Sequence, residues 1–343
     1  MSSLLEARNV TKIFSSNGII GKKRAVTVAL ENASLVIPHE PPAIISIAGE
    51  SGSGKTTLSR LLLGLIRPTR GEIFYEGKAL DAMSRSERMN YRRRVQAIFQ
   101  DPFEVYNPFY KVDHVLMTPL ACFEPGMSKA ERQATVERTL EQVGLRSEET
   151  LGRYPHQLSG GQRQRVMVAR ALMLNPSIIV ADEPVSMVDA SLRATILESL
   201  LNAHRDLGVS LVYITHDLTT AYQVSQSIVM LYQGAMVEVG DVDRVIKEPK
   251  HPYTRLLVSS IPLPDPRRRW GEGVEQVMAP ERQDGQKTRG CKFAPRCPYA
   301  MEICYEQPPA LYATDRGRAT ACFLYRDAPA LAFEEVGALY SPQ

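Results

Sequence analysis

The sequence contains no run of about 18 apolar residues, which excludes a membrane-spanning helix. An excess of one charge is also missing: 41 basic and 38 acidic side chains give a formal net charge of +3. This small charge does not favour a nucleic-acid partner. The first residues lack the basic-then-apolar form of a secretory leader, so we expect the chain to stay in the cytosol. Thiols remain reduced there, and we expect the five cysteines to form no structural disulfide.

What is present is the composition of an ordinary globular protein. Apolar residues make up 44% of the 343 residues and charged residues 23%. A chain of this length can bury a core in one large domain or two smaller ones.

Three short apolar runs end in polar residues. They are Ile44–Ala48 before Gly49, Ile178–Ala181 before Asp182, and Leu211–Ile214 before Thr215. Helical patterns separate these runs, which predicts a parallel sheet with helical crossovers. Ligands bind such sheets at the carboxyl ends of the strands.

Helices and antiparallel strands are predicted around this sheet. A helix should start near Gly54 and point Leu58, Leu61, Leu62 and Leu65 inward. The first 40 residues read as antiparallel strands, and residues 108–172 read as helical, with a capping box at Ser128 and Glu131. Prolines become frequent past residue 247, which is typical of a linker or an extended crossing segment. The fold class is therefore α/β.

The run from Gly49 to Thr56 fits the P-loop pattern G-x-x-x-x-G-K-[ST]. Its glycines let backbone N–H groups face phosphate oxygens. Lys55 should reach the β- and γ-phosphates, and Thr56 should give its hydroxyl to Mg²⁺. A Gly-Ser loop with a chance lysine is the alternative, which the preceding strand and following helix disfavour. The expected ATP-binding residues of this run are Gly49, Ser51, Gly52, Ser53, Gly54, Lys55, Thr56 and Thr57.

Two acidic residues close the second apolar run. Asp182 has the position of a carboxylate that holds Mg²⁺, directly or through water. Glu183 follows it and should polarise the attacking water as general base. An acidic turn before Pro184 is the structural alternative, and the P-loop makes it less favoured.

Leu158-Ser159-Gly160-Gly161-Gln162 follows the P-loop by about a hundred residues. A P-loop combined with this sequence resembles the ATP-binding subunit of ABC transporters. The resemblance implies a P-loop NTPase core with an N-terminal antiparallel β subdomain and an inserted helical subdomain. It also implies that Ser159, Gly160, Gly161 and Gln162 contact ATP held by a second subunit in a head-to-tail dimer.

The same resemblance gives roles to four separate residues. Gln100 would contact Mg²⁺ and the water, His216 the γ-phosphate, and Asp189 the dimer interface. Phe14 would stack on adenine, where the family usually has tyrosine. The alternatives are a surface glutamine, a structural histidine and a core phenylalanine. The expected catalytic residues are Lys55, Gln100, Glu183 and His216, and the expected Mg²⁺ ligands are Thr56, Gln100 and Asp182.

The resemblance narrows to the oligopeptide and dipeptide importers. Phe99–Pro102 with Asn107-Pro108, and His251–Leu257 after the core, look like that group. It implies a cassette over residues 1–247, a helical subdomain over about 101–172, and a C-terminal extension over 248–343. The chain would hydrolyse ATP to drive import of peptides or similar small solutes. One alternative is a soluble ABC ATPase acting on ribosomes or DNA. A second is a non-catalytic binding module that uses ATP only to dimerise, which Glu183 and His216 disfavour.

This reading implies several partners. They are a second ATPase subunit, two membrane permeases and, indirectly, an extracytoplasmic solute-binding protein, with no nucleic acid. The chain would lie on the cytoplasmic side of the cell membrane as a peripheral subunit. Residues 103–106 depart from the small residues that are usual in the group. We expect the aromatics Phe103, Tyr106 and Phe109 in this loop to dock on the permease, and the alternative is that they pack under the helical region.

Four cysteines lie in the C-terminal tail, separated by five, six and seventeen residues. They are Cys291, Cys297, Cys304 and Cys322. Four thiolates suit a 4Fe–4S cluster, which some peptide-importer ATPases carry, or a Zn²⁺ ion, and unliganded thiols are the third alternative. Cys122 is expected to be an ordinary thiol. The tail is far in sequence from every phosphate-contacting motif, so we expect it to serve stability or assembly.

Overall fold

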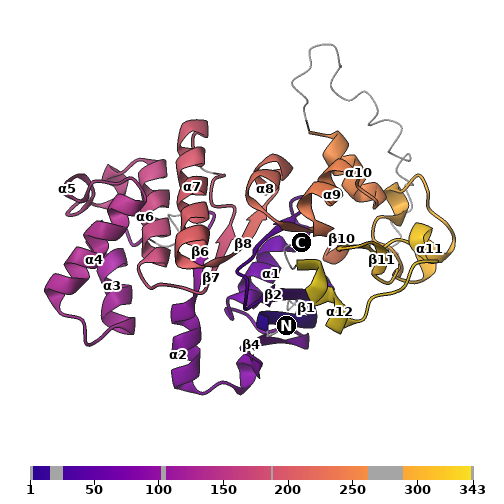
Figure 1. Ribbon diagram of the computed structural model, residues 1–343, viewed down its shortest axis with the longest axis horizontal. Helices are drawn as coiled ribbons and strands as arrows, with labels where there is room; N and C mark the ends of the chain where they lie inside the picture. The colour runs from indigo at the N-terminus through magenta and orange to yellow at the C-terminus, as the bar shows by residue number, and fades with distance from the viewer. Residues whose placement is uncertain (1–2, 16–25, 102–105, 187, 262–288, 341–343) are drawn as a thin grey trace, which may run out of the picture. The chain divides into compact units, whose positions relative to one another are not determined.

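The computed structural model describes residues 3–15, 26–101, 106–186, 188–261 and 289–340. The chain divides into two compact units (Figure 1). The first unit joins Met1–Ala79 to Thr215–Gln343, and the second is Leu80–Ile214. Each unit carries part of the predicted site.

The first unit begins with an antiparallel sheet in the order β2-β1-β4-β5. Its strands are β1 (Ser3–Ser15), β2 (Val26–Pro38), β4 (Arg70–Tyr75) and β5 (Lys78–Ala79). Residues 4–7 of β1 and 33–35 of β2 are buried, whereas the last two residues of β1 and the first three of β2 are exposed. The antiparallel strands predicted for the first 40 residues are confirmed.

The core sheet of this unit runs in the order β3-β9-β10-β12-β11. β3 pairs with β9 in parallel, and β10 pairs antiparallel with both β9 and β12. The strands are β3 (Ile44–Ala48), β9 (Ser227–Tyr232), β10 (Ala235–Asp241), β11 (Tyr312–Asp315) and β12 (Arg318–Thr320). The C-terminal extension therefore adds two strands to the sheet that carries the P-loop.

Helices pack on this sheet through one apolar cluster. The cluster joins Ala48 at the end of β3 to Tyr253 and to Phe293 of the extension. Its helical residues come from α8 (Leu218–Val224), α9 (Val242–Lys247) and α10 (Pro252–Ser259). The other helices of this unit are α1 (Lys55–Leu62), α11 (Ile303–Glu306) and α12 (Phe333–Val336). The cluster thus runs from the strand before the P-loop into the cysteine-bearing tail.

Two local predictions in this unit need correction. α1 buries Leu58, Leu61 and Leu62 as expected, but it ends at Leu62, and Leu65 is exposed. The prolines past residue 247 do not all lie in an extended segment, and Pro262, Pro264 and Pro266 of that prediction lie outside the described residues. Pro252 occupies the first turn of α10, where its missing N–H would have had no partner in any case.

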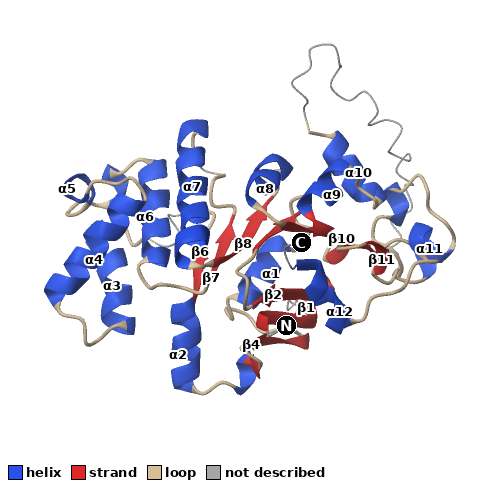
Figure 2. Ribbon diagram, in the orientation of Figure 1, coloured by secondary structure: helices blue, strands red, loops and turns tan. Residues whose placement is uncertain are grey.

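The second unit contains a parallel sheet in the order β6-β7-β8 and a group of helices (Figure 2). The strands are β6 (Val95–Ile98), β7 (Ile178–Asp182) and β8 (Ser210–Thr215). The helices are α2 (Arg85–Arg94), α3 (Val112–Phe123), α4 (Lys129–Gln142), α5 (Ser147–Thr150), α6 (Gly160–Leu172) and α7 (Ala190–Leu207). Every residue of β7 and β8 is buried, which explains their nearly continuous apolar sequences.

The helical character predicted for residues 108–172 is confirmed. α3, α4 and α6 pack on one another, and α6 also packs on α7 (Figure 1). Ser128 and Glu131 form the predicted capping box at the start of α4. Val136, Leu140 and Val143 are fully buried. The α/β fold class, with parallel and antiparallel sheets and a helical insertion, is confirmed.

Within the described ranges, none of the helices combines the length and the apolar character that a bilayer-crossing segment requires.

Candidate active site

The P-loop connects the buried strand β3 to the first turn of α1. Lys55 is buried, and its Nζ donates hydrogen bonds to the carbonyl oxygens of Gly49 at 2.7 Å and Glu50 at 2.9 Å. These bonds hold the Lys55 ammonium against the backbone of the P-loop. Thr56 is exposed on the first turn of the helix.

Two features of the loop suit an anion. Gly54 has φ 105°, and a Cβ there would lie 2.5 Å from the carbonyl oxygen of Ala29, so this position requires glycine. The buried Ser53 Oγ has no hydrogen-bond partner among the described residues. A buried hydroxyl without a partner is costly, so a ligand oxygen that accepts from it would be favoured.

The second unit places Gln100 against Glu183. The Nε2 of Gln100 donates to a carboxylate oxygen of Glu183 at 3.1 Å. Gln100 follows β6 and Glu183 follows β7, and these strands are parallel neighbours, so both side chains lie at the same edge of the sheet. Asp182 is buried as the last residue of β7. This edge of the sheet thus combines two carboxylates with an amide.

The backbone of Glu183 is unusual. Its φ is 46°, in the left-handed region, although Pro184 follows. Such conformations cost of order 1–3 kcal/mol and cluster at functional sites. The Glu183 N–H donates to Ile214 O at 2.8 Å, and its carbonyl accepts from Ser186, which together fix this conformation. The sequence pattern gave no signal for this strain.

Ser159 caps α6 in its own chain. Its Oγ accepts from the N–H of Gln162, and the Gln162 side chain accepts from the N–H of Ser159. Ser159 and Gly160 remain exposed, while a Cβ at Gly161 would lie 2.3 Å from Leu192 of α7. Gly161 therefore has a packing role beside the predicted role toward ATP.

The remaining predicted residues lie at the surface of their units. His216 is exposed directly after β8, and Asp189 is exposed at the start of α7. Phe14, on β1, is 43% exposed with Lys12 Nζ 5.2 Å from its ring. This exposure makes the core-phenylalanine alternative wrong.

The predicted docking aromatics differ from one another. Phe103 lies outside the described residues. Tyr106 is buried, and its hydroxyl donates to Arg163 O at 2.9 Å, so it packs inside the helical unit and is not a docking residue. Phe109 is 86% exposed, as a docking residue would be.

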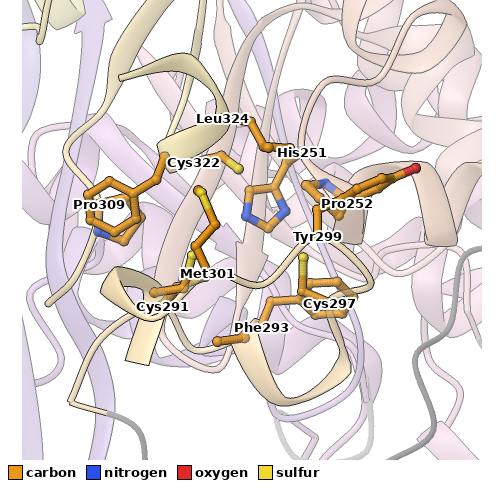
Figure 3. Close-up of a pocket in the computed structure, with 13 residues that line it drawn as sticks. His251, Pro252, Cys291, Phe293, Cys297, Tyr299, Met301, Pro309, Cys322 and Leu324 are labelled. Atoms are coloured by element: carbon orange, nitrogen blue, oxygen red, sulfur yellow. The ribbon is translucent and has the colours of Figure 1, made fainter. Parts of the chain in front are cut away.

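The four tail cysteines line one pocket (Figure 3). Cys291, Cys297, Cys304 and Cys322 share it with the His251 ring. Burial raises the pKa of the Cys297 thiol to about 11 and that of Cys322 to about 12. These thiols are therefore neutral near pH 7, and a cation would have to displace their protons. Cys122 is exposed, away from these residues in the sequence and in the other unit.

The described residues contain no group of three or more His, Cys, Asp or Glu side chains placed to hold a metal ion. The geometry of the described residues therefore gives no support to a Zn²⁺ ion or to a 4Fe–4S cluster. Of the expected metal site, the structure shows that the four cysteines line one pocket.

The tail is far from the P-loop in sequence but contacts it in the fold. Arg296 donates to the Glu50 carboxylate at 3.3 Å, and the Glu50 N–H donates to the Tyr253 hydroxyl at 2.9 Å. Arg296 and Tyr253 are thus functional candidates that sequence reasoning missed. Separations of 246 and 203 residues left no local signal.

Comparisons with known proteins identify the family of this chain. The ABC transporter family matches residues 30–186, and the C-terminal region of oligopeptide/dipeptide transporters matches residues 237–304. The chain is 40% identical over 316 residues to a putative oligopeptide transport ATP-binding protein, YkfD of Bacillus subtilis, covering 90% of this chain and 92% of that protein. The chain belongs to the ABC transporter ATP-binding family.

Other relatives support the same membership. The dipeptide transport ATP-binding protein DppF of Haemophilus influenzae is 36% identical and spans 93% of this chain and 96% of its own length. The dimeric structure of MJ0796, a bacterial ABC transporter cassette, superposes with a TM-score of 0.62 at 30% identity, covering 69% of this chain and 98% of that cassette. As an ABC ATP-binding protein, the chain binds ATP and is an ATPase.

Proposed function

We propose that this chain is the ATP-hydrolysing subunit of an ABC importer that carries peptides or similar small solutes. One observation carries the proposal at the site: Gln100 is bonded to Glu183 beside the buried Asp182. The peptide-type cargo is supported by relatives named for oligopeptide and dipeptide transport that align over nearly the whole chain.

In the proposed mechanism, Lys55 and the P-loop N–H groups bind the phosphates. Thr56, Gln100 and Asp182 supply oxygen donors, which Mg²⁺ prefers, and the bound ion would offset the phosphate charge. Glu183 takes a proton from the attacking water, and Gln100 orients its carboxylate. His216 contacts the γ-phosphate, and Phe14 stacks on adenine.

The proposed assembly is a head-to-tail dimer with ATP at the joint. Ser159 and Gly160 are exposed at the N-terminus of α6, where free N–H groups favour an anion. Asp189 would cross the same interface. The related cassette MJ0796 forms a dimer, and one of its dimeric structures is bound to ADP and Pi. The second ATPase is a copy of this chain or a relative.

The chain would lie on the cytoplasmic side of the cell membrane. Closing and reopening of the ATPase dimer would there drive two membrane permeases, with a solute-binding protein acting outside. The proposed boundaries are a cassette over 1–247, its helical subdomain over about 101–172, and an extension over 248–343. The test is purification of the tagged chain from membranes and identification of the subunits that accompany it. Permeases, and ATP turnover raised by a peptide-loaded binding protein, are expected. Recovery with ribosomes or DNA would contradict the proposal.

We also propose that the four-cysteine pocket holds a 4Fe–4S cluster. Its support is the donor set alone, since four cysteines line one pocket and four thiolates suit such a cluster. Protein purified without oxygen should absorb broadly near about 400 nm, and serine at any of the four cysteines should remove that absorption. Cys122→Ser should leave it unchanged. Colourless wild-type protein, with or without bound zinc, would exclude the cluster.

A further inference from the structure

The P-loop carries an acidic residue beside the predicted phosphate site. Glu50 directly follows Gly49, and the carbonyl oxygen of Glu50 accepts from Lys55 Nζ at 2.9 Å. A carboxylate at this position would repel the phosphates of ATP unless a cation offsets its charge. The cation in contact with it comes from the C-terminal extension.

That cation is Arg296. Its guanidinium lies 3.3 Å from Glu50 Oε2 and also donates to the hydroxyl of Tyr232 at 3.3 Å. It lies over two rings, 5.8 Å from the centroid of Tyr232 and 5.6 Å from that of Phe293. The side chain is 23% exposed. These contacts hold the guanidinium in one place, which increases its effect on the carboxylate.

A second contact reaches the same residue from α10. Tyr253 is fully buried, and its hydroxyl accepts from the Glu50 N–H at 2.9 Å. The N–H of Tyr253 in turn donates to His251 Nδ1 at 3.0 Å. The backbone and the side chain of Glu50 are therefore both held by residues from beyond position 250.

Both residues that contact Glu50 are next to residues that line the cysteine pocket. Arg296 directly precedes Cys297, and the turn that carries it is closed by the bonds from Arg296 N–H to Phe293 O at 3.0 Å and from Cys297 N–H to Ala294 O at 3.2 Å. His251 lines the pocket, where its ring lies among the cysteine side chains (Figure 3). It is completely buried, and its Nε2 has no hydrogen-bond partner among the described residues. A buried donor without a partner points to an acceptor in the pocket.

We propose that Arg296 and Tyr253 are positioning residues for the P-loop, and that the cysteine pocket affects ATP binding through them. The inference rests on the proposed ATPase function. Arg296 offsets the charge of Glu50, and Tyr253 fixes the backbone of Glu50. Whatever occupies the pocket holds Cys297 and His251 in place, and so holds both contacts.

The test is the Kd for ATP, measured by titration with a fluorescent ATP analogue. Arg296→Met should weaken ATP binding about threefold to tenfold, a range set by the partial exposure of the pair. The added change Glu50→Gln should restore affinity, because it removes the uncompensated carboxylate. Arg316→Met is the control, because this arginine is exposed in the same extension. The affinity of the Arg316→Met protein for ATP should equal that of the wild type.

Two results would overturn the positioning role of Arg296. One is an Arg296→Met protein that binds ATP as tightly as the wild type. The other is a double variant that binds as weakly as Arg296→Met alone, since a merely structural arginine would not be rescued by changing Glu50. If Arg296→Met fails to fold, Arg296→Gln keeps a donor for Tyr232 and is measured in its place. Wild-type protein that binds no ATP would instead refute the proposed function, and this inference with it.

The pocket is tested separately. Cys297→Ser should weaken ATP binding in the wild-type background and have a smaller effect in the Glu50→Gln background. Cys122→Ser is the matched control and should change neither. If Cys297→Ser leaves the Kd unchanged while Arg296→Met raises it, the pocket does not act on the P-loop.

Discussion

Lys55 is the residue on which ATP binding should depend most directly. Its Nζ is already held over the loop by Gly49 and Glu50, so it needs little rearrangement to meet phosphate. Lys55→Ala removes a charge-assisted contact and should weaken ATP binding roughly 10- to 100-fold.

The comparison is Lys129→Ala, because Lys129 is exposed at the start of α4 and belongs to no predicted motif. Its affinity for ATP should match the wild type in the same titration. Equal affinities of the Lys55 variant and the wild type would mean that the P-loop does not hold the nucleotide.

At the scale of elements, α4 and α6 form a matched pair. Each begins with a serine capping box, at Ser128 and at Ser159. Ser128→Arg and Ser159→Arg should each cost about 1 kcal/mol in the free energy of unfolding, because each removes one cap. Only Ser159→Arg should stop ATP hydrolysis, since only this cap is proposed to contact the partner's ATP.

Thermal melts and turnover assays on both variants separate these effects. Nucleotide binding by the Ser159 variant should survive, because its own P-loop is intact. The name signature motif is used for residues 158–162. If Ser128→Arg lowers turnover as much as Ser159→Arg does, the loss comes from the missing helix cap and not from the signature motif.

Tyr106, a buried aromatic residue that precedes α3 in the sequence, gives a second prediction at the scale of elements. Tyr106→Ala should reduce the free energy of unfolding by about 3 kcal/mol, because it leaves a cavity and removes the hydrogen bond to Arg163 O. Tyr106→Phe should cost about 1 kcal/mol through the hydrogen bond alone.

Phe109→Ala is the exposed counterpart and should change stability by less than about 0.5 kcal/mol. Denaturant unfolding of the three variants checks this order. A stable Tyr106→Ala protein would show that the ring contributes nothing to the core.

For the whole molecule, the dimer proposal predicts complementation. Lys55→Ala and Ser159→Arg chains are each inactive in a dimer of their own kind. If the partner is a copy of this chain, mixing the two should recover part of the turnover, because one joint then holds an intact P-loop and an intact signature motif. No recovery, with activity only on adding a related ATPase, would indicate a heterodimer.

Local features of this molecule were predictable from sequence. The P-loop strand and helix, the capping box at Ser128 and the parallel runs ending in Asp182 and Thr215 follow from patterns within a few residues. Burial was less predictable. Leu65 has the right spacing but falls beyond the end of α1, and Tyr106 lies in a loop yet is buried by α6.

Contacts between distant segments were not predictable. Arg296 reaches Glu50 because β12 pairs with β10 and carries the extension onto the P-loop sheet, and nothing in the local sequence specifies that pairing. The strained backbone of Glu183 likewise depends on a bond to Ile214, on a separate strand.

The central claim is that Glu183 is the general base of an ATPase. Its most direct test is the ATP turnover of Glu183→Gln, measured in the presence of whichever second ATPase pairs with the chain. The control is Glu198→Gln, because Glu198 is an exposed glutamate of α7. The amide keeps the shape but accepts no proton, so turnover should fall roughly 10²- to 10⁴-fold while ATP stays bound and the dimer persists. Turnover near that of the wild type would contradict the account.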